Sequence, residues 1–418
     1  MKKLFIVLFS VSLVSLSVSA QVFKKLSDKV KDKATQRANQ KTDQAIDKSL
    51  DKTEEGVNNA GKNSTSNNNS NNSSTQSPST QSNPTTDNGS SLSPTVSKVY
   101  QNYDFIPGEK ILFEDNFATD ADGEFPSHWE LQNGQAVVNQ YNGKPTLLIT
   151  DGNAGWVSPL MKKKKYLDKE WTIEFDTYRD PKAYPIKIYL QDDAHNDLGH
   201  IDINNNDVST TFRNTEGDEK FLAGNYPEDL REENFFNRWH HIAIACKNKQ
   251  VKIYVDQVRA LVIPNIYIDI LAVGFGGIGA SDGPLALANV RIAEGAGMNM
   301  LGKKFTDTKI VTHGINFDVN KAVIKPESMG TLNGIVQIMK DNPEIKFEVG
   351  GHTDSDGDDA ANLKLSQARA DAVRNQLIAM NVDAARLTTK GYGETKPISD
   401  NTSPEGKANN RRVEFVKK

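Results

Sequence analysis

The sequence predicts a multidomain chain in which an antiparallel β-sandwich of the jelly-roll type is followed by a smaller α+β domain. Residues 61–97 are almost all Asn, Ser, Thr, Gln, Pro and Gly, and they separate the N-terminal part from the rest. Residues 98–296 alternate apolar and polar positions in short runs, which is typical of antiparallel strands. Residues 305–418 alternate strand and helix patterns, which predicts a βαβαβ-type sheet with helices on one face.

Length and composition narrow the class of protein. The 418 residues allow two or three domains, and 37% hydrophobic residues are fewer than a fully packed chain would hold. A formal net charge of -4 argues against a nucleic-acid partner, since no strongly basic domain is left to neutralise phosphates. The single cysteine, Cys246, excludes an intramolecular disulfide and a cysteine-based zinc site, and its alternating run predicts a buried packing role.

The first twenty residues, 1–20, have the pattern of a secretory signal peptide. Two lysines precede an apolar core over residues 4–14, and Val18-Ser19-Ala20 has the small residues of a cleavage site. A retained membrane anchor is disfavoured because the apolar run is too short to span a bilayer. The mature chain is therefore expected to begin near Gln21, which offers no attachment point for a lipoprotein-type lipid.

Two polar segments come next. Residues 21–60 carry a thin apolar stripe at helical spacing, beginning with Phe23, Leu26 and Val30, which predicts a polar amphipathic helix. That helix either self-associates or touches a membrane surface, or it is a solvated and partly formed spacer; the residues leave both readings open. Residues 61–97 cannot bury enough apolar surface to offset chain ordering, which predicts a disordered linker.

The strand-rich region contains a segment with a familiar pattern. The stretch from Arg238-Trp239-His240 through Tyr254-Val255-Asp256 resembles the paired strands of concanavalin-like or laminin-G-like jelly rolls. Such folds include glycoside hydrolases, which use paired carboxylates. Glu174 and Asp176 begin that spacing, but Tyr178 and Arg179 stand where the last carboxylate belongs. The sequence therefore predicts no enzyme, and it leaves open whether this region binds a glycan or protein ligand or only packs.

Two other groups in this region have metal-binding alternatives. His240 and His241 are adjacent on a strand, so their side chains face opposite sides and one site cannot easily take both. Asp120 and Asp122 either hold a calcium ion at the edge of the sheet or form a turn. The prediction is that the chain has no cofactor and no catalytic metal, with calcium near Asp120 and Asp122 left open.

The last domain has a definite order of predicted elements. Strands are expected around residues 310–317, 345–349, 387–390 and 412–416. A helix begins near Pro326, a residue favoured at helix starts, and ends at Asn342-Pro343. A second helix runs from Asp359 to Met380, with apolar residues at three- and four-residue steps as its buried stripe.

An acid and a guanidinium in this domain suggest a ligand that carries both charges. Asp354 lies on the loop after a strand, and Arg369 lies on the following helix, on the same side as Asn362 and Ser366. A carboxylate and a guanidinium in one groove suit a zwitterion. Two alternatives stay open here: a structural Asp354–Arg369 salt bridge without a ligand, and an acidic loop over 355–359 that binds calcium or only caps the helix.

Five segments, in order, make residues 305–418 resemble the OmpA-like C-terminal domain, the peptidoglycan-binding module of bacterial envelopes. They are Phe317-Asp318-x-Asn320, Gly351-His352-Thr353-Asp354, Asn362-x-x-Leu365-Ser366-x-x-Arg369-Ala370, Gly391-x-Gly393-Glu394-x-x-Pro397 and Asn410-Arg411-Arg412. The resemblance implies that Asp354 takes the ammonium group and Arg369 the carboxylate of diaminopimelate in the peptide stem. It further implies contacts around the same groove from Asn320, Asn362, Leu365 and Arg411. Asp356 and Gly406-Lys407 depart from the family's usual sequence.

These observations predict a non-catalytic cell-envelope protein. Its C-terminal domain would bind peptidoglycan of the diaminopimelate type noncovalently, and thereby anchor or link the envelope. The alternative is a carbohydrate-binding adhesin or lectin in which the sandwich is the functional domain and the wall domain only an anchor. A signal peptide and wall binding predict the periplasm of a Gram-negative bacterium, with association with the outer membrane as a further expectation.

Overall fold

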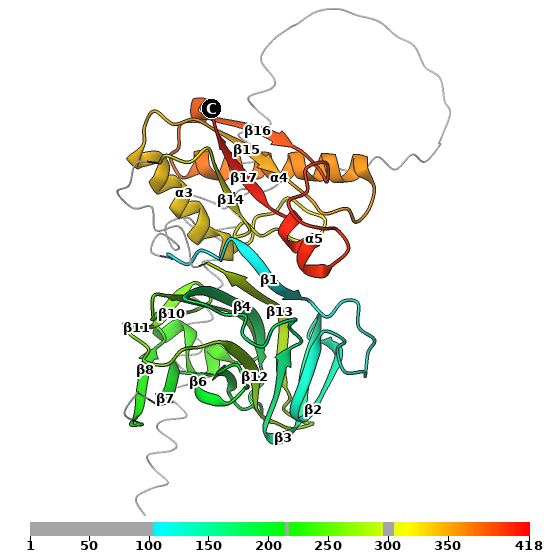
Figure 1. The fold of residues 1–418 in the computed structure, drawn as a ribbon, viewed down its shortest axis with the longest axis vertical. Helices are drawn as coiled ribbons and strands as arrows, with labels where there is room; N and C mark the ends of the chain where they lie inside the picture. Colours follow the sequence, from blue (N-terminus) through cyan, green and yellow to red (C-terminus); the bar gives the residue numbers. More distant parts are fainter. Residues whose placement is uncertain (1–102, 214–216, 296–304) are drawn as a thin grey trace, which may run out of the picture. The chain divides into compact units, whose positions relative to one another are not determined.

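The computed structural model describes residues 103–213, 217–295 and 305–418 (Figure 1). The signal peptide predicted over 1–20, the polar helix over 21–60 and the linker over 61–97 lie outside the described residues. Within the described ranges, none of the helices combines the length and the apolar character that crossing a membrane requires. All described residues belong to one compact unit of the chain.

The described part of residues 103–295 forms a sheet of thirteen antiparallel strands. Their bounds are β1 (Lys110–Asp115), β2 (Trp129–Tyr141), β3 (Lys144–Pro159), β4 (Glu170–Arg179), β5 (Ile186–Gln191), β6 (Asp197–Ile203), β7 (Asp207–Arg213), β8 (Glu219–Asn225), β9 (Arg238–Lys247), β10 (Gln250–Val255), β11 (Val258–Ile263), β12 (Ala272–Gly279) and β13 (Leu285–Glu294). The order is β11-β10-β9-β4-β13-β3-β12-β5-β6-β7-β8, with β1 paired to β13 and β2 to β3. Two 3-10 turns, η1 (Glu228–Leu230) and η2 (Glu232–Phe235), connect β8 to β9.

The sheet curls until its two ends meet. A Cβ atom added at Gly224 on β8 would lie 1.9 Å from the carbonyl oxygen of Ala260 on β11, so the two end strands of the order touch. The predicted antiparallel strands are confirmed. The finer description as a jelly-roll sandwich stays a prediction, because the strands form one continuous sheet instead of two separate ones.

Alternation along the strands decides which side chains form the core of this sheet. On β4, Trp171 and Phe175 are buried in the core, while Glu174 and Asp176 alternate with them and lie on the other face. Burying a Phe or Leu side chain contributes about 1.5–3 kcal/mol, so this alternation fixes the register of the strand. Cys246 is buried in the same core, as its alternating run predicts.

His240 and His241 lie on opposite faces of β9, as adjacent strand residues must. His240 stacks on Phe235 with 3.8 Å between ring centroids, and its Nδ1 lies 2.8 Å from a carboxylate oxygen of Asp256. On the other face, Nδ1 of His241 lies 2.9 Å from Asp176. The ring of each histidine therefore contacts a different carboxylate, and the two histidines do not share a site.

The loop that contains Asp120 has the hydrogen bonds of a turn. Oδ1 of Asp120 accepts hydrogen bonds from the backbone N–H and the hydroxyl of Ser127, at 3.1 and 2.9 Å. Gly123 adopts a φ of 85° and donates to the carbonyl of Val138. In the ranges that the structure describes, no group of three or more His, Cys, Asp or Glu side chains is arranged to hold a metal ion.

Residues 305–418 form a four-stranded sheet with helices, in the order predicted from the sequence. The strands are β14 (Lys309–Thr312), β15 (Phe347–Gly351), β16 (Leu387–Gly391) and β17 (Val413–Lys417), and the helices are η3 (Pro326–Ser328), α3 (Met329–Asp341), α4 (Asp359–Ala379), η4 (Ala384–Arg386) and α5 (Pro404–Asn410). The sheet order is β14-β17-β15-β16, and β15 and β16 are parallel because α4 connects them. The first strand ends at Thr312, earlier than predicted, and α5 is an addition.

Apolar residues of α3 and α4 share one core with one face of this sheet. Phe347 and Val349 of β15 and Phe415 of β17 are buried in that core. Helix α4 approaches the sheet closely: a Cβ atom added at Gly351 would lie 2.1 Å from the carbonyl oxygen of Ser366. The pair therefore needs glycine on the strand, and this close packing brings the end of β15 next to the middle of α4.

Asp358 caps α4, which confirms the capping alternative for the acidic loop. Its side chain accepts a hydrogen bond from the backbone N–H of Ala361 at 3.0 Å. Such a cap satisfies one of the helix's unpaired N–H groups. The helix start is thereby fixed directly after the loop that carries Asp354.

The segment before β1 packs between the two sheets. Tyr103 and Phe105 are buried in the core that contains α3, together with Tyr254 from β10. A Cβ atom added at Gly330 of α3 would lie 1.8 Å from the carbonyl oxygen of Phe105. Asp104 accepts a hydrogen bond from the Tyr254 hydroxyl at 2.8 Å. Residues 103–105 therefore tie the thirteen-stranded sheet to helix α3.

Candidate functional site

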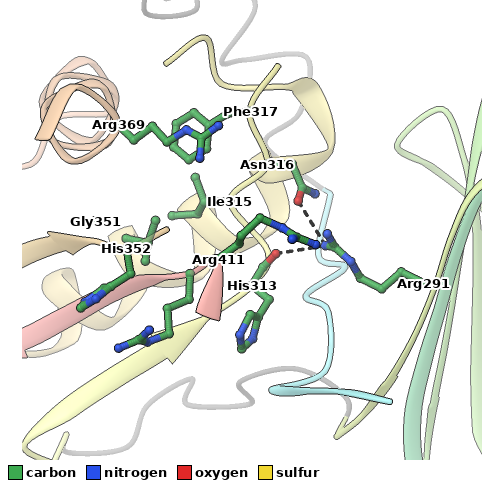
Figure 2. A pocket seen from close by; sticks show the side chains of 11 residues that line it. Arg291, His313, Ile315, Asn316, Phe317, Gly351, His352, Arg369 and Arg411 are labelled. Carbon is green, nitrogen blue, oxygen red and sulfur yellow. Dashed lines mark hydrogen bonds between the residues drawn. The ribbon is translucent and has the colours of Figure 1, made fainter. Parts of the chain in front are cut away.

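A polar cavity of about 120 Å³ opens where the loop after β14, the end of β15, helix α4 and the start of β17 meet strand β13 (Figure 2). Its lining residues are Arg291, His313, Ile315, Asn316, Phe317, Gly351, His352, Arg369, Arg411, Arg412 and Val413. The lining includes four guanidinium groups and no carboxylate. We call this cavity the arginine pocket.

Among the arginines that line the pocket, Arg369 has the most N–H groups without an acceptor among the described residues. Its Nε donates to the carbonyl of Lys321 at 3.0 Å, and its guanidinium carbon lies 5.0 Å from the centre of the Phe317 ring. Its two terminal nitrogens make no hydrogen bond or ion pair with any residue that the structure describes. Burial and the nearby Arg411 lower the pKa of Arg369 from its ordinary value. A fixed guanidinium with two free nitrogens suits a carboxylate.

Asp354 is buried and pairs with Arg411. One of its carboxylate oxygens accepts a hydrogen bond from Nη1 of Arg411 at 2.5 Å, and the other accepts the backbone N–H of Asp356 at 3.2 Å. The preceding backbone is held to β17, since the N–H of His352 donates to the carbonyl of Arg412 at 3.1 Å. The alternative of a direct Asp354–Arg369 salt bridge is wrong, because the partner of Asp354 is Arg411.

Arg411 connects two carboxylates that are far apart in the sequence. Its Nη1 donates to Asp354, and its Nη2 donates to Glu114 of β1. Burial opposes the charge of Arg411, but Glu114 and Asp354 outweigh burial and raise its pKa. Arg411 therefore stays a cation between two anions.

Of the six predicted site residues, Arg369 and Arg411 line the arginine pocket, whereas Asp354, Asn320, Asn362 and Leu365 do not. Asn362 is buried under the Asp354 loop, where its amide donates to the carbonyl of Asp356 at 3.1 Å and to the carboxylate of Glu394 at 2.7 Å. Asn320 is exposed in a tight turn with a φ of 57°. Leu365 is half-buried on α4. Asn362 thus supports the loop, and direct ligand contacts from these three residues stay predictions.

Arg291 and Glu114, which carry charges beside the predicted residues, were not predicted from the sequence. Arg291 of β13 donates to the carbonyl of His313 at 3.2 Å and to Asn316 at 3.1 Å, as Figure 2 shows. The same guanidinium donates twice to Oε1 of Glu114, at 2.8 and 2.6 Å. Burial raises the pKa of Glu114, but Arg291 and Arg411 outweigh burial and lower it. The alternation of apolar and polar residues indicates that Arg291 faces away from the apolar core. The sequence does not show which residues Arg291 contacts.

The two histidines of the arginine pocket are neutral at neutral pH. Burial is the main cause that lowers the pKa of His313 to about 4, and it does the same for His352. His352 also stacks on Tyr392 with 4.9 Å between ring centroids. The charge of the site therefore comes from the arginines and their carboxylate partners.

Counting charges shows which ligand this site favours. Arg411 pairs with Asp354 and Glu114, and Arg291 pairs with Glu114 and, at 4.0 Å, with Glu174, whereas Arg369 has no ion-pair partner among the described residues. Arg412 does not change the balance, because it pairs with Glu414 at 2.8 Å. An anionic group that reaches Arg369 would supply the counter-charge that this guanidinium lacks.

A comparison with protein families identifies this part of the chain. Residues 316–411 match the model of the OmpA family. Those residues form an OmpA family domain. The resemblance predicted from the five sequence segments is confirmed, and all six predicted site residues lie inside the matched range. Glu114 and Arg291 lie outside it.

The same domain relates the chain to known proteins. It is 47% identical over 100 residues, 24% of this chain and 31% of the relative, to Outer membrane porin F of Pseudomonas fluorescens. It is 37% identical over 107 residues, 25% of this chain and 33% of the relative, to Peptidoglycan-binding protein ArfA of Mycobacterium bovis. The chain thus spans about a third of the length of these relatives. A solved structure, the peptidoglycan-associated lipoprotein from Burkholderia pseudomallei, is 26% identical with a TM-score of 0.24, covering 28% of this chain and 94% of that one.

Proposed function

We propose that this chain is a non-catalytic protein of the bacterial envelope that binds peptidoglycan noncovalently through its OmpA family domain. The arginine pocket carries the proposal, because it presents a guanidinium with open donors beside a buried Asp–Arg pair. The name of the mycobacterial relative, a peptidoglycan-binding protein, supports the ligand class. The name of the porin relative supports an outer-membrane setting, and with it the periplasm of a Gram-negative bacterium.

The ligand that fits is the zwitterionic end of a diaminopimelate residue in the peptide stem. Arg369 binds its carboxylate through the two terminal nitrogens, and Asp354 accepts its ammonium group on the carboxylate that Arg411 also contacts. Each charge-assisted hydrogen bond of this kind contributes about 1.5–3 kcal/mol. Two bonds from Arg369 therefore account for a loss of affinity of roughly a hundredfold or more when they are removed.

The thirteen-stranded sheet has a second candidate role as a glycan-binding surface. Tyr141, Tyr178 and Trp239 form a row of half-buried rings whose neighbours stand 5.6 and 5.5 Å apart between centroids. Sugars and aromatic faces are compatible contacts, and Lys144 adds a polar group 4.4 Å from the Trp239 ring. Binding of a labelled oligosaccharide panel by the full chain, lost on Trp239→Ala, tests this adhesin-like alternative.

Co-sedimentation with purified diaminopimelate-type sacculi tests the proposed function. We expect the full chain to sediment with sacculi and Arg369→Ala to stay in the supernatant. Arg374→Ala is the matched control, because Arg374 lies on the same helix and donates to the carbonyl of Leu387, outside the arginine pocket. Both variants lose one positive charge; Arg369→Ala loses one side chain-to-carbonyl hydrogen bond and Arg374→Ala loses two, and only Arg369→Ala removes a residue of the arginine pocket.

Folding of both variants is checked by thermal unfolding in parallel. A folded Arg369→Ala variant that sediments as well as the parent chain contradicts the proposal. Equal loss of sedimentation in Arg374→Ala contradicts it as well, because that outcome means that net charge alone, and no defined pocket, drives the interaction.

A further inference from the structure

A residue from outside the OmpA family domain contacts two arginines of the arginine pocket. Glu114 belongs to β1 of the thirteen-stranded sheet, and its two carboxylate oxygens accept hydrogen bonds from different arginines of the arginine pocket. Oε2 accepts from Arg411 and Oε1 accepts from Arg291 at 2.8 and 2.6 Å. The side chain of Glu114 is 18% exposed, so water screens these pairs only weakly.

The position of Glu114 matters because Arg411 competes with the ligand for Asp354. An ammonium group that binds Asp354 meets the guanidinium of Arg411, which already holds the same carboxylate. Two positive charges on the same carboxylate repel each other, whereas a negative charge within about 4–6 Å reduces this repulsion. Removing the carboxylate of Glu114 takes one negative charge away from Arg411 and Arg291, next to Asp354. Glu114 therefore keeps the ammonium end of the site from becoming cationic.

The contact also fixes where Arg411 stands. With Nη2 bound to Glu114 and Nη1 bound to Asp354, the guanidinium is held at both ends and cannot turn toward the ligand carboxylate. Arg369 is then the guanidinium left for that carboxylate, since its terminal nitrogens are open toward the described residues around it. Glu114 thus holds Arg411 beside Asp354 and leaves Arg369 to bind the ligand carboxylate.

We propose that Glu114 is a positioning residue that makes the site select a zwitterion over a simple carboxylate, so that the thirteen-stranded sheet takes part in ligand recognition. This inference rests on the proposed function, and it names the ammonium group as the part of the ligand that the site recognises. It also means that the OmpA family domain of this chain recognises its ligand as part of a larger unit.

Titration calorimetry on the full chain with two synthetic ligands tests the inference. The first is the tripeptide L-Ala-γ-D-Glu-meso-diaminopimelate, and the second is the same peptide with the side-chain amino group acetylated. We expect the parent chain to prefer the first by about tenfold or more, as one charge-assisted contact implies. Glu114→Gln is expected to bind the acetylated peptide as tightly as the parent or tighter, and to lose the preference.

Two further variants separate the charge of Glu114 from its structural contacts. Glu114→Asp keeps the charge and should keep most of the preference. Asn409→Ala removes the hydrogen bonds that link α5 to the backbone of Ile111 on β1, at 3.0 Å each, without changing any charge. We expect this variant to keep the preference even if both affinities fall together.

The outcomes distinguish the inference from the proposed function. If the parent chain binds neither peptide, the proposed function fails and the inference fails with it. If the parent chain binds and prefers the free amine but Glu114→Gln keeps the same ratio, the proposed function stands and the role of Glu114 is wrong. Loss of the ratio in Asn409→Ala to the same degree as in Glu114→Gln also overturns the inference, because docking of β1 would then explain both.

Discussion

Replacing Arg411 by alanine should destabilise the fold around Asp354 by a measurable amount. Asp354 is 7% exposed and would keep only the backbone N–H of Asp356, at 3.2 Å, as a donor. Removing one partner of a fully buried ion pair costs about 3–5 kcal/mol. The Arg411 side chain is 39% exposed, so water would enter the vacated space and reduce that cost to about 1–3 kcal/mol. Glu114 loses less, because Arg291 still donates to it twice.

A double-mutant cycle measures this coupling directly. Arg411→Ala, Asp354→Asn and the double variant are unfolded in urea and followed by far-UV circular dichroism, with tryptophan fluorescence as a separate report on the thirteen-stranded sheet. We expect a coupling free energy of about 1 kcal/mol or more between the two positions. Lys407→Ala is the matched control, since its exposed partner Asp356 makes that ion pair worth about 0.5 kcal/mol or less. A coupling near zero for Arg411 and Asp354 refutes the reasoning.

Two further predictions concern stability. Burial opposes the charged form of His241, but the carboxylates of Asp176 and Glu174 outweigh burial and raise its pKa from 6.5 to about 10. The stability that this histidine contributes is therefore complete below pH 6.5 and is lost as the pH rises through 10. His241→Gln should flatten the fall of the unfolding free energy over that pH window; an unchanged slope contradicts the ion pair. Asp358→Ala should cost about 1 kcal/mol through loss of the α4 cap, and Asp359→Ala clearly less; equal losses would mean that the cap contributes nothing.

Much of the fold follows from local patterns in the sequence. Period-two alternation predicts the antiparallel strands, because burial on one face of a strand is a local property. The start of the second helix at Asp359 and its acidic cap are equally local. Closure of the sheet, by contrast, brings Gly224 of β8 into contact with Ala260 of β11. The periodicity of a strand does not show which distant strand will lie beside it. Helix α5 carried a signal that could have been used, since Ser403 and Pro404 form a typical helix start.

The candidate site divides in the same way. Residues in neighbouring segments, such as Asp354 and Arg369, are recognisable because their spacing and residue types match a motif. The pairing of Arg411 with Asp354 spans 57 positions, and that with Glu114 spans 297, so neither partner is readable from spacing. The direct roles expected of Asn320 and Leu365 stay predictions.

A crystal structure of the full chain with the meso-diaminopimelate tripeptide tests the central claim most directly. We expect density for the peptide in the arginine pocket, with its side-chain carboxylate on the terminal nitrogens of Arg369 and its ammonium group on Asp354. A peptide bound elsewhere, or one whose carboxylate lies on Arg411 while Arg369 stays empty, would contradict the account.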